Sequence, residues 1–471
     1  MKVNTLYLNL GLVTVFGIAL SIAILITPLN FLVLQIMFLA ALFFFYLLFK
    51  DITTFIMIWF LSLLFIMFTK FPLGIDVPNL SPDRMLWFLL IVCYVFHALT
   101  GRISLSNRTI EIFMLILCTL AIFSIIRMKG VSLSRDILDT YSKLFNAYVV
   151  PFSIFFIAKD FINEEYNIRK LFSFLSVVLL YLSLTAIFEH FRLVDFIFPR
   201  GIMNPGLGIH FGRARGPFLQ AAVNGSVLGM LSATNLYMAM NTRFPYRLFF
   251  IVIACLSPVA IFLTYTRASW LAFILCCTFM LFVNRRFRKY IGILILLGLV
   301  LFIPLHSKIL DMERFSARVY SENPINDRIN LYHTYIAMFK DKPFLGFGFA
   351  NFTYHSHEYF SRIKGHVMNI PVIHDTFFGT LVELGALGLI VLLSILSLIF
   401  RKSLLLFEKL KDREMSLNRE IVVMFWGVGI VYIINSLFID VKYEPVQNVI
   451  FYLAAGIMAG LYERRMRCSA L

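Results

Sequence analysis

The chain has 471 residues, of which 60% are hydrophobic and 14% charged, and its mean hydropathy is +0.85. Soluble globular domains carry about 25% charged residues, so this composition excludes a soluble domain and indicates a membrane protein. The formal net charge of +16 is carried by segments between apolar runs rather than by a basic module, so no nucleic-acid partner is expected.

Apolar runs long enough to cross a bilayer recur along the chain. A spanning helix needs ~20 residues, whereas the strands of a membrane barrel are shorter and alternate polar with apolar positions. We therefore expect an all-α fold, a polytopic transmembrane helical bundle of about 12–14 spans that forms one membrane domain over residues 1–471. The predicted spans are 6–26, 29–49, 52–68, 85–100, 109–126, 144–158, 171–191, 220–241, 247–265, 268–283, 291–305, 373–400, 420–439 and 447–462.

The segment 306–372 is the longest interruption between predicted spans. In the short loops, Lys and Arg gather on the side of the two termini, and a loop as long as 306–372 lies outside the range in which such charges report orientation. We therefore expect both termini in the cytoplasm and a large extracytoplasmic loop that carries short helices. Surrounding membrane lipid is an expected partner.

Arginines stand in two outward-facing segments beside predicted spans. Arg213 and Arg215, in GRARGPF, directly precede a span. A guanidinium stays charged and offers a fixed fork of donors, which suits a phosphate at the level of the lipid headgroups. The alternative is an interfacial pair that extends toward water. Arg267, in YTRASW, breaks an apolar run with a charge that is costly within a membrane, which favours a functional role.

Two motifs in the long loop resemble ligand sites but are incomplete. Gly346 and Gly348, in FLGFGF, neither follow a strand nor belong to a full nucleotide fingerprint, so we expect a tight turn. His355 and His357, in YHSHEYF, are two residues apart without a second ligand pair. A surface loop is therefore favoured there, and no metal is expected.

His374 and Asp375 stand where the chain enters the predicted span 373–400. An imidazole titrates near neutral pH and is a natural proton acceptor, and a carboxylate in a first helical turn is favoured by the helix dipole. The pair lies in the same outward layer as the arginines. His374 is therefore the candidate catalytic base, with an interfacial structural histidine as the alternative.

Taken together, these segments resemble the family of O-antigen ligases and O-antigen polymerases. The stretch DRINLYHTYIAMFKDKPFLGFGFANF is similar to the family signature in its arginine, Arg328, its acidic-x-Pro turn and its Leu-Gly-x-Gly turn. IHDTFFGTLVELGALGLI resembles the His-Asn and Glu-x-Gly-x-x-Gly elements that follow, with Asp375 where Asn is usual. The second element corresponds to Glu383, Gly385 and Gly388.

Two upstream segments resemble further elements of this family. RARGPF is similar to its Arg-x-x-Gly-x-Phe element, with Arg213 on the arginine, although QAAVN replaces the Pro-Asn that commonly follows. TYTRASWL is similar to its Thr/Ser-Arg-x-x-Trp-Leu element, with Arg267 on the arginine. The resemblance covers residues 199–400.

The resemblance implies a glycosyltransferase of the bacterial inner membrane that acts on the periplasmic side. Such an enzyme transfers a glycan from undecaprenyl diphosphate to an acceptor hydroxyl, with inversion and without a metal or other cofactor. His374 would accept the proton of the acceptor. The residues expected to bind the substrate are Arg213, Arg215, Arg267, Arg328 and Asp375.

Glu383 lies nine residues after His374. At ~100° per residue this places the two side chains on opposite sides of a straight helix. We therefore expect Glu383 to pair with, or pack on, another helix rather than to assist His374.

Several functions remain open on the sequence. A ligase attaches finished O-antigen to lipid A core, whereas a polymerase joins repeat units to a growing glycan, and both use the same donor chemistry. We favour the ligase. A transporter of polysaccharide or lipid carrier is the alternative from another class, but its charges should lie near the membrane midplane rather than in one outward cap.

Overall fold

The computed structural model describes residues 51–66, 68, 81–101, 108–127, 135–283, 288, 292, 323–360, 373–410 and 418–470. The chain forms two compact units, Met1–Ile56 and Met57–Leu471, and nearly all of the first lies outside the described residues. The predicted spans 6–26 and 29–49 lie outside them entirely, and 291–305 almost entirely.

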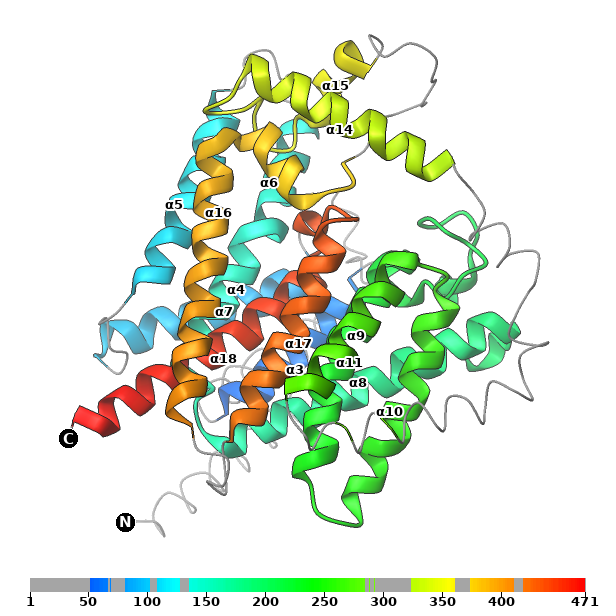
Figure 1. The fold of residues 1–471 in the computed structure, drawn as a ribbon, viewed down its shortest axis with the longest axis vertical. Coiled ribbons are helices and arrows are strands. Elements are labelled where there is room, and N and C mark those ends of the chain that lie inside the picture. The colour runs from blue at the N-terminus through cyan, green and yellow to red at the C-terminus, as the bar shows by residue number, and fades with distance from the viewer. Residues whose placement is uncertain are drawn as a thin grey trace, which may run out of the picture. The chain divides into compact units, whose positions relative to one another are not determined.

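Every regular element of the described residues is helical, which confirms the all-α fold class (Figure 1). Among these residues, 8 helices are long and apolar enough to cross a membrane, which confirms a polytopic helical protein. The α-helices are α3 (Ile52–Leu64), α4 (Pro82–Leu99), α5 (Thr109–Ile126), α6 (Arg135–Leu144), α7 (Val150–Phe161), α8 (Glu165–Phe191), α9 (Ala221–Asn241), α10 (Tyr246–Leu263), α11 (Arg267–Val283), α14 (Asn323–Asp341), α15 (Phe352–Phe360), α16 (Thr376–Lys409), α17 (Arg419–Ser436) and α18 (Pro445–Ala470).

The short predicted span 144–158 belongs to a longer helical run. A π-helical turn, η1 (Phe145–Val149), joins α6 to α7 without a break. The apolar helical stretch Asp139–Phe161 is 23 residues long, which is sufficient to cross a membrane.

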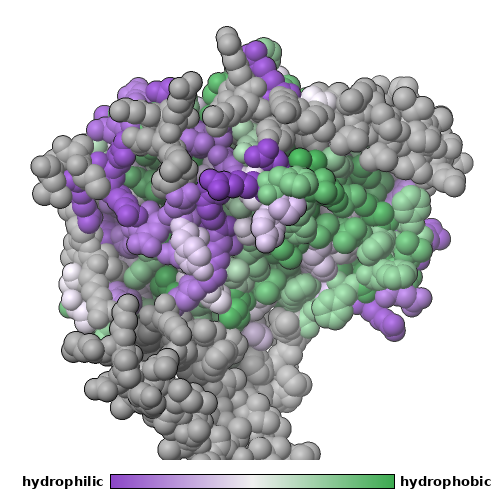
Figure 2. All heavy atoms as spheres, turned by 90° about the horizontal axis from the view of Figure 1, so that it is seen from below, coloured by the Kyte–Doolittle hydropathy of each residue, from purple (hydrophilic) through white to green (hydrophobic). Residues whose placement is uncertain are grey.

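The central helices differ in burial from the peripheral ones. α18 packs against α7 and α16, and α17 packs against α9 and α11. In contrast, α4, α5 and α10 expose large apolar side chains, among them Phe88, Phe123 and Leu248. Figure 2 shows a broad hydrophobic area beside a hydrophilic one on the face seen from below. Apolar surface of this extent is expected where helices face lipid.

The helix α16 is kinked at Gly385, whose backbone angles are φ 71° and ψ −171°. A residue with a side chain rarely adopts this positive φ, so glycine is required here. The kink frees backbone groups that a straight helix would pair internally. Two of them are satisfied from outside the helix, because the N–H groups of Ala386 and Leu387 donate to the carbonyls of Pro343 and Phe344.

The segment YHSHEYF is helical rather than the surface loop that its histidines suggested. It forms most of α15, in which Phe352, Ser356 and Phe360 are buried. Their spacing of four residues puts them on one face of a helix, and this buried face outweighs the polar character of the intervening histidines. Figure 1 shows α14 and α15 at the end of the bundle where α16 begins and α17 ends.

Candidate active site

The backbone that carries Arg213 and Arg215 is fixed by the C-terminal ends of two helices. The carboxylate of Glu189, near the end of α8, accepts hydrogen bonds from the N–H groups of Arg215 at 3.1 Å and Gly216 at 2.8 Å. The N–H of Ala214 donates to the carbonyl of Leu263, the last residue of α10, at 3.1 Å. These bonds place the arginine segment beside the start of α11.

Arg215 is almost completely buried, with 1% of its surface exposed. Its guanidinium donates to the carbonyl oxygens of Ile202, Asn204 and Leu207, at 2.7, 2.6 and 2.5 Å. These bonds use the donors that a diphosphate would require. The geometry therefore favours a structural role for Arg215, and its contact with a substrate stays a prediction.

Arg213 differs from Arg215 although it lies only two residues earlier. It is half-buried, and its side chain makes no hydrogen bond or ion pair with any other residue in the described part of the chain. No described residue occupies the donors of its guanidinium, and its contact with a substrate stays a prediction.

Arg267 and Arg328 come together from distant segments. Arg267 is the exposed first residue of α11, and Arg328 lies half-buried on α14. The guanidinium of Arg328 stands over the ring of Phe438, 5.1 Å from its centre. Burial lowers the pKa of Arg328, Tyr332 opposes this shift, and the positive charge of Arg267 lowers the pKa further. Two cations close enough to repel each other are stabilised by an anion between them.

One face of α14 holds the His-Asp pair. Arg328, Tyr332 and Tyr335 are spaced by four and three residues, so they share a face of the helix. The hydroxyl of Tyr332 lies near the carboxylate of Asp375, whose negative charge adds to burial in raising the pKa of Tyr332. The hydroxyl of Tyr335 accepts a hydrogen bond from the backbone N–H of His374 at 3.1 Å. The long loop thus positions the residues from which α16 begins.

Asp375 is the N-cap residue of α16. Its Oδ1 accepts a hydrogen bond from the N–H of Phe378 at 2.8 Å, and the side chain is buried. Burial raises the pKa of Asp375, and hydrogen bonds from Phe378 and Phe377, together with the nearby Tyr332 hydroxyl, oppose the rise. His374, just before the cap, is half-exposed. Asp375 therefore fixes the helix start beside His374, while its contact with a substrate stays a prediction.

Gly346 and Gly348 form the expected tight turn, which docks into the kink of α16. Both have positive φ, 62° and 108°. The N–H groups of Phe347 and Gly348 each donate at 2.9 Å to the carbonyls of Val382 and Glu383. A Cβ at Gly346 would stand 2.5 Å from the backbone of Glu383, so the close approach requires glycine. The turn prediction is confirmed.

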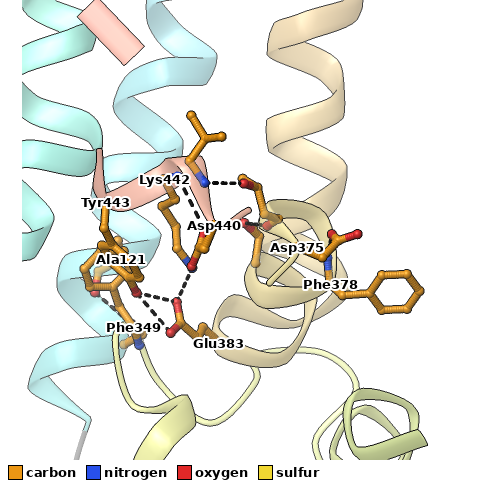
Figure 3. A network of polar contacts seen from close by, with 12 residues as sticks. Ala121, Phe349, Asp375, Phe378, Glu383, Asp440, Lys442 and Tyr443 are labelled. Atoms are coloured by element: carbon orange, nitrogen blue, oxygen red, sulfur yellow. Dashed lines mark hydrogen bonds and ion pairs between the residues drawn. The ribbon is translucent and has the colours of Figure 1, made fainter. Parts of the chain in front are cut away.

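Glu383 enters a buried ion-pair network (Figure 3). Its Oε2 lies 2.5 Å from the Nζ of Lys442, and the hydroxyl of Tyr443 donates to the same carboxylate at 2.9 Å. Lys442 Nζ also lies 3.5 Å from the Oδ2 of Asp440. This confirms that Glu383 pairs with another segment rather than with His374.

The network lies beneath the start of α16. Thr376, the first residue of α16, donates from its hydroxyl to the carbonyl of Ile439 at 3.1 Å and accepts from the N–H of Val441 at 2.9 Å. Burial raises the pKa of Asp440 to about 7, Lys442 opposes the rise, and Glu383 adds to it.

The sequence analysis did not identify Asp440 and Lys442. The signal that could have done so is DVKYEP, in which three charged residues lie within five positions between two apolar spans. Tyr332 and Tyr335 were missed as well, because aromatic residues at helical spacing usually indicate a hydrophobic face. In the described ranges, no group of three or more His, Cys, Asp or Glu side chains could hold a metal ion.

These contacts bring together residues that the sequence keeps far apart. Arg267, Arg328 and His374 lie at one end of the bundle, and the bond between Ala214 and Leu263 ties the Arg213 segment to the same end. Cationic side chains beside a half-exposed imidazole can bind an anionic group and accept a proton from a neighbouring hydroxyl.

Comparison with known proteins gives one family. Residues 249–393 match the family model described as O-antigen ligase. The matched region contains Arg267, Arg328, His374 and Glu383 and ends before the DVKYEP segment, and the Arg213 segment precedes it. A search of curated proteins finds no match. Over residues 249–393 the chain is therefore similar to the O-antigen ligase family, in agreement with the resemblance of its motifs, and its described helices indicate a multi-pass membrane protein.

Proposed function

We propose that the protein is a glycosyltransferase of the bacterial inner membrane that works on the periplasmic side as an O-antigen ligase. It moves a glycan from undecaprenyl diphosphate to a hydroxyl of lipid A core. The observation that carries the proposal is the family match over residues 249–393, because this region contains Arg267, Arg328 and His374, which the fold gathers at one end of the bundle.

The arginines act on the donor. As the acceptor oxygen attacks the anomeric carbon, the bond from that carbon to the diphosphate oxygen breaks, and negative charge grows on the leaving diphosphate. Arg213, Arg267 and Arg328 are the cations available to stabilise this charge, which is the usual largest contribution of a preorganised site. Displacement in one step inverts the anomeric centre.

His374 acts on the acceptor. Its imidazole takes the proton of the attacking hydroxyl as the new glycosidic bond forms. Its backbone is held by Tyr335 and by the capped start of α16, so the imidazole is presented from a fixed position at the surface. A positioned base is effective because the acceptor need not lose its proton to bulk water.

The test is transfer by the purified protein in lipid nanodiscs. The protein receives a polyprenyl-diphosphate-linked glycan, with or without lipid A core as acceptor. A ligase gives glycan-modified core only when both substrates are present. Longer lipid-linked chains from the donor alone would identify a polymerase instead. Movement of the donor across the bilayer without any transfer product would contradict both and favour a transporter.

The orientation has its own test. Tyr354 is exposed on α15 and Glu408 is exposed near the C-terminal end of α16. In intact cells with a permeabilised outer membrane, a membrane-impermeant thiol reagent should label Tyr354→Cys and leave Glu408→Cys unlabelled until the inner membrane is broken. The reverse pattern would place the site in the cytoplasm and contradict the proposal.

A further inference from the structure

The end of α8 and the segment that follows it, residues 191–200, expose an unusual amount of large apolar surface. Five side chains are strongly exposed: Phe191, Leu193, Val194, Phe196 and Phe198, the last two at 69% and 68%. Contiguous apolar surface is rare on the water-exposed parts of proteins and marks a site of contact with another molecule or with a membrane.

The segment runs back along α8 instead of continuing away from it. The ring of Phe196 lies 5.5 Å from that of Phe188, and the hydroxyl of Tyr181 donates to the carbonyl of Phe198 at 2.5 Å. Tyr181 precedes the end of α8 at Phe191 by ten residues, which is ~15 Å along the helix axis. The Tyr181 hydroxyl reaches up to the level of Thr185, so the chain reverses at the end of the helix and runs back beside its last turns.

This level lies at the edge of the apolar layer. α8 has 27 residues, a length of ~40 Å, whereas the hydrocarbon core of a bilayer is ~30 Å thick. Glu165, Arg169 and Lys170 occupy the first turns of the helix and Glu189 and His190 its last turn, so its apolar part runs from residue 171 to 188. Phe196 packs on Phe188 at the end of this part, and Phe198 is bonded to Tyr181 within it, so both lie at the edge of the apolar layer in the leaflet nearest the long loop.

Several backbone groups of this segment are satisfied within the protein. Non-helical backbone at membrane depth is tolerated where its polar groups are satisfied by the protein. The carbonyl of Phe198 is satisfied by Tyr181, and the N–H groups of Phe196 and Ile197 bond within the segment. Further along, the Arg215 guanidinium satisfies the carbonyls of Ile202, Asn204 and Leu207.

The charged residues of the segment fit a position at the edge of the apolar layer, within reach of the headgroups. Arg192 and Arg200 are both exposed and bracket the apolar side chains, with one acidic residue, Asp195, between them. Long cationic side chains at such positions extend to the headgroup level, where they meet phosphates.

From these observations we propose that residues 191–200 form a re-entrant segment that inserts into the leaflet nearest the long loop. The occupant of its apolar surface is membrane phospholipid, not a protein partner. The segment leads through Ile202 and Leu207 to Arg215 and so supports the Arg213 segment at the depth at which a lipid-linked diphosphate would travel. The insertion does not depend on the proposed transfer reaction.

The experiment is site-specific photocrosslinking of the full-length protein in nanodiscs of phosphatidylethanolamine and phosphatidylglycerol. Phe196 and Phe198 are replaced, one at a time, by p-benzoylphenylalanine. The positive control carries the same replacement at Phe123, which is exposed at 53% on the candidate span α5. The negative control carries it at Tyr354, exposed at 79% on α15.

We expect phospholipid adducts at positions 196 and 198 with a yield like that at 123 and well above that at 354, read by mass spectrometry. Each variant must keep the thermal unfolding midpoint of the wild type, and Leu193 provides a third position if one aromatic replacement fails to fold. Lipid yields no higher than at 354 would overturn the proposal. Crosslinks to a second copy or to another protein in place of lipid would also overturn it.

Discussion

Two sets of charged residues lie at the same end of this bundle and differ in burial. The surface set consists of Arg213, Arg267, Arg328 and His374, which are half-buried or exposed. The buried set consists of Arg215, Glu383, Asp440 and Lys442, each exposed by less than 10%. The residues of the buried set are paired or hydrogen-bonded inside the protein, and those of the surface set are accessible to a ligand.

The comparison is sharpest between Arg213 and Arg215. They are the same residue type, two positions apart, and both suit a phosphate on sequence grounds. The carbonyls of the preceding loop surround Arg215 and leave Arg213 outside. Charge at a membrane surface therefore does not by itself identify a binding residue. The additional criterion is whether the protein already satisfies the hydrogen-bond donors of that residue.

The largest effect on activity is expected from the surface set. His374→Ala should reduce transfer by about 10²- to 10⁴-fold, because a positioned general base contributes that much. The unfolding midpoint should stay near that of the wild type, since the side chain is half-exposed. The measurement is the initial rate with lipid-linked donor and acceptor in nanodiscs. His333→Ala, at an exposed position of α14, is the matched control and should remain active. Full activity of His374→Ala would make the residue an interfacial anchor.

The largest effect on stability is expected from the buried set. Lys442→Met leaves the Glu383 carboxylate buried without its cation, which typically costs about 3–5 kcal/mol. Thermal unfolding in detergent should show a clear loss, and Lys340→Met, at an exposed position on α14, should show none. The double variant Lys442→Met with Glu383→Gln should recover much of the loss, because no uncompensated carboxylate remains at position 383. Equal losses in the single and double variants would argue against the ion pair as the cause.

Replacement of each of the two neighbouring arginines by lysine should have different effects on the transfer rate and on the unfolding midpoint. Arg213→Lys keeps the charge but loses the fork of donors, so transfer should fall about tenfold at an unchanged unfolding midpoint. Arg215→Lys cannot reach three carbonyls at once, so it should lower the midpoint first. The measurements are the transfer rate and the thermal unfolding midpoint of both purified variants. If Arg215→Lys lowers the rate at an unchanged midpoint, the structural assignment of Arg215 is wrong.

The smallest effect is expected at Asp375. Burial raises the pKa of this carboxyl, so on acidification it takes up a proton, and weakens its hydrogen bonds, at a higher pH than an ordinary aspartate. Asparagine caps a helix about as well and does not titrate. Asp375→Asn should therefore stay within about twofold of the wild-type rate near neutral pH and shift the acidic limb of the pH–rate profile to lower pH. An unchanged limb, or one moved to higher pH, would exclude Asp375 as a titrating group that limits the rate.

Part of the site could be predicted from local patterns. The incomplete glycine motif was expected to be a turn, and the positive φ angles of Gly346 and Gly348 confirm it. The helical period placed the side chains of Glu383 and His374 on opposite sides of the helix and predicted a partner for Glu383 in another segment. The ion pair of Glu383 with Lys442 confirms this prediction. Both inferences concern residues close in sequence, for which backbone geometry leaves few alternatives.

The partners of these residues could not be predicted. Glu383 and Lys442 are 59 residues apart in the sequence, and Tyr335 and His374 are 39 apart. Neither spacing carries a periodic signal, because such contacts depend on which helices pack together and where α16 kinks. The kink at Gly385 also depends on a distant segment, because carbonyls next to the docked turn accept the hydrogen bonds that the helix loses at the kink.

The sequence by itself determined that this is a polytopic helical membrane protein and where its long apolar helices lie among the described residues, because the bilayer requires long apolar stretches whose backbone bonds are satisfied within each helix. Only the tertiary structure decided which of two neighbouring arginines is enclosed and which charges form a buried network. The reason is physical: hydropathy acts residue by residue along the chain, whereas burial and hydrogen-bond satisfaction depend on groups that distant segments bring into contact.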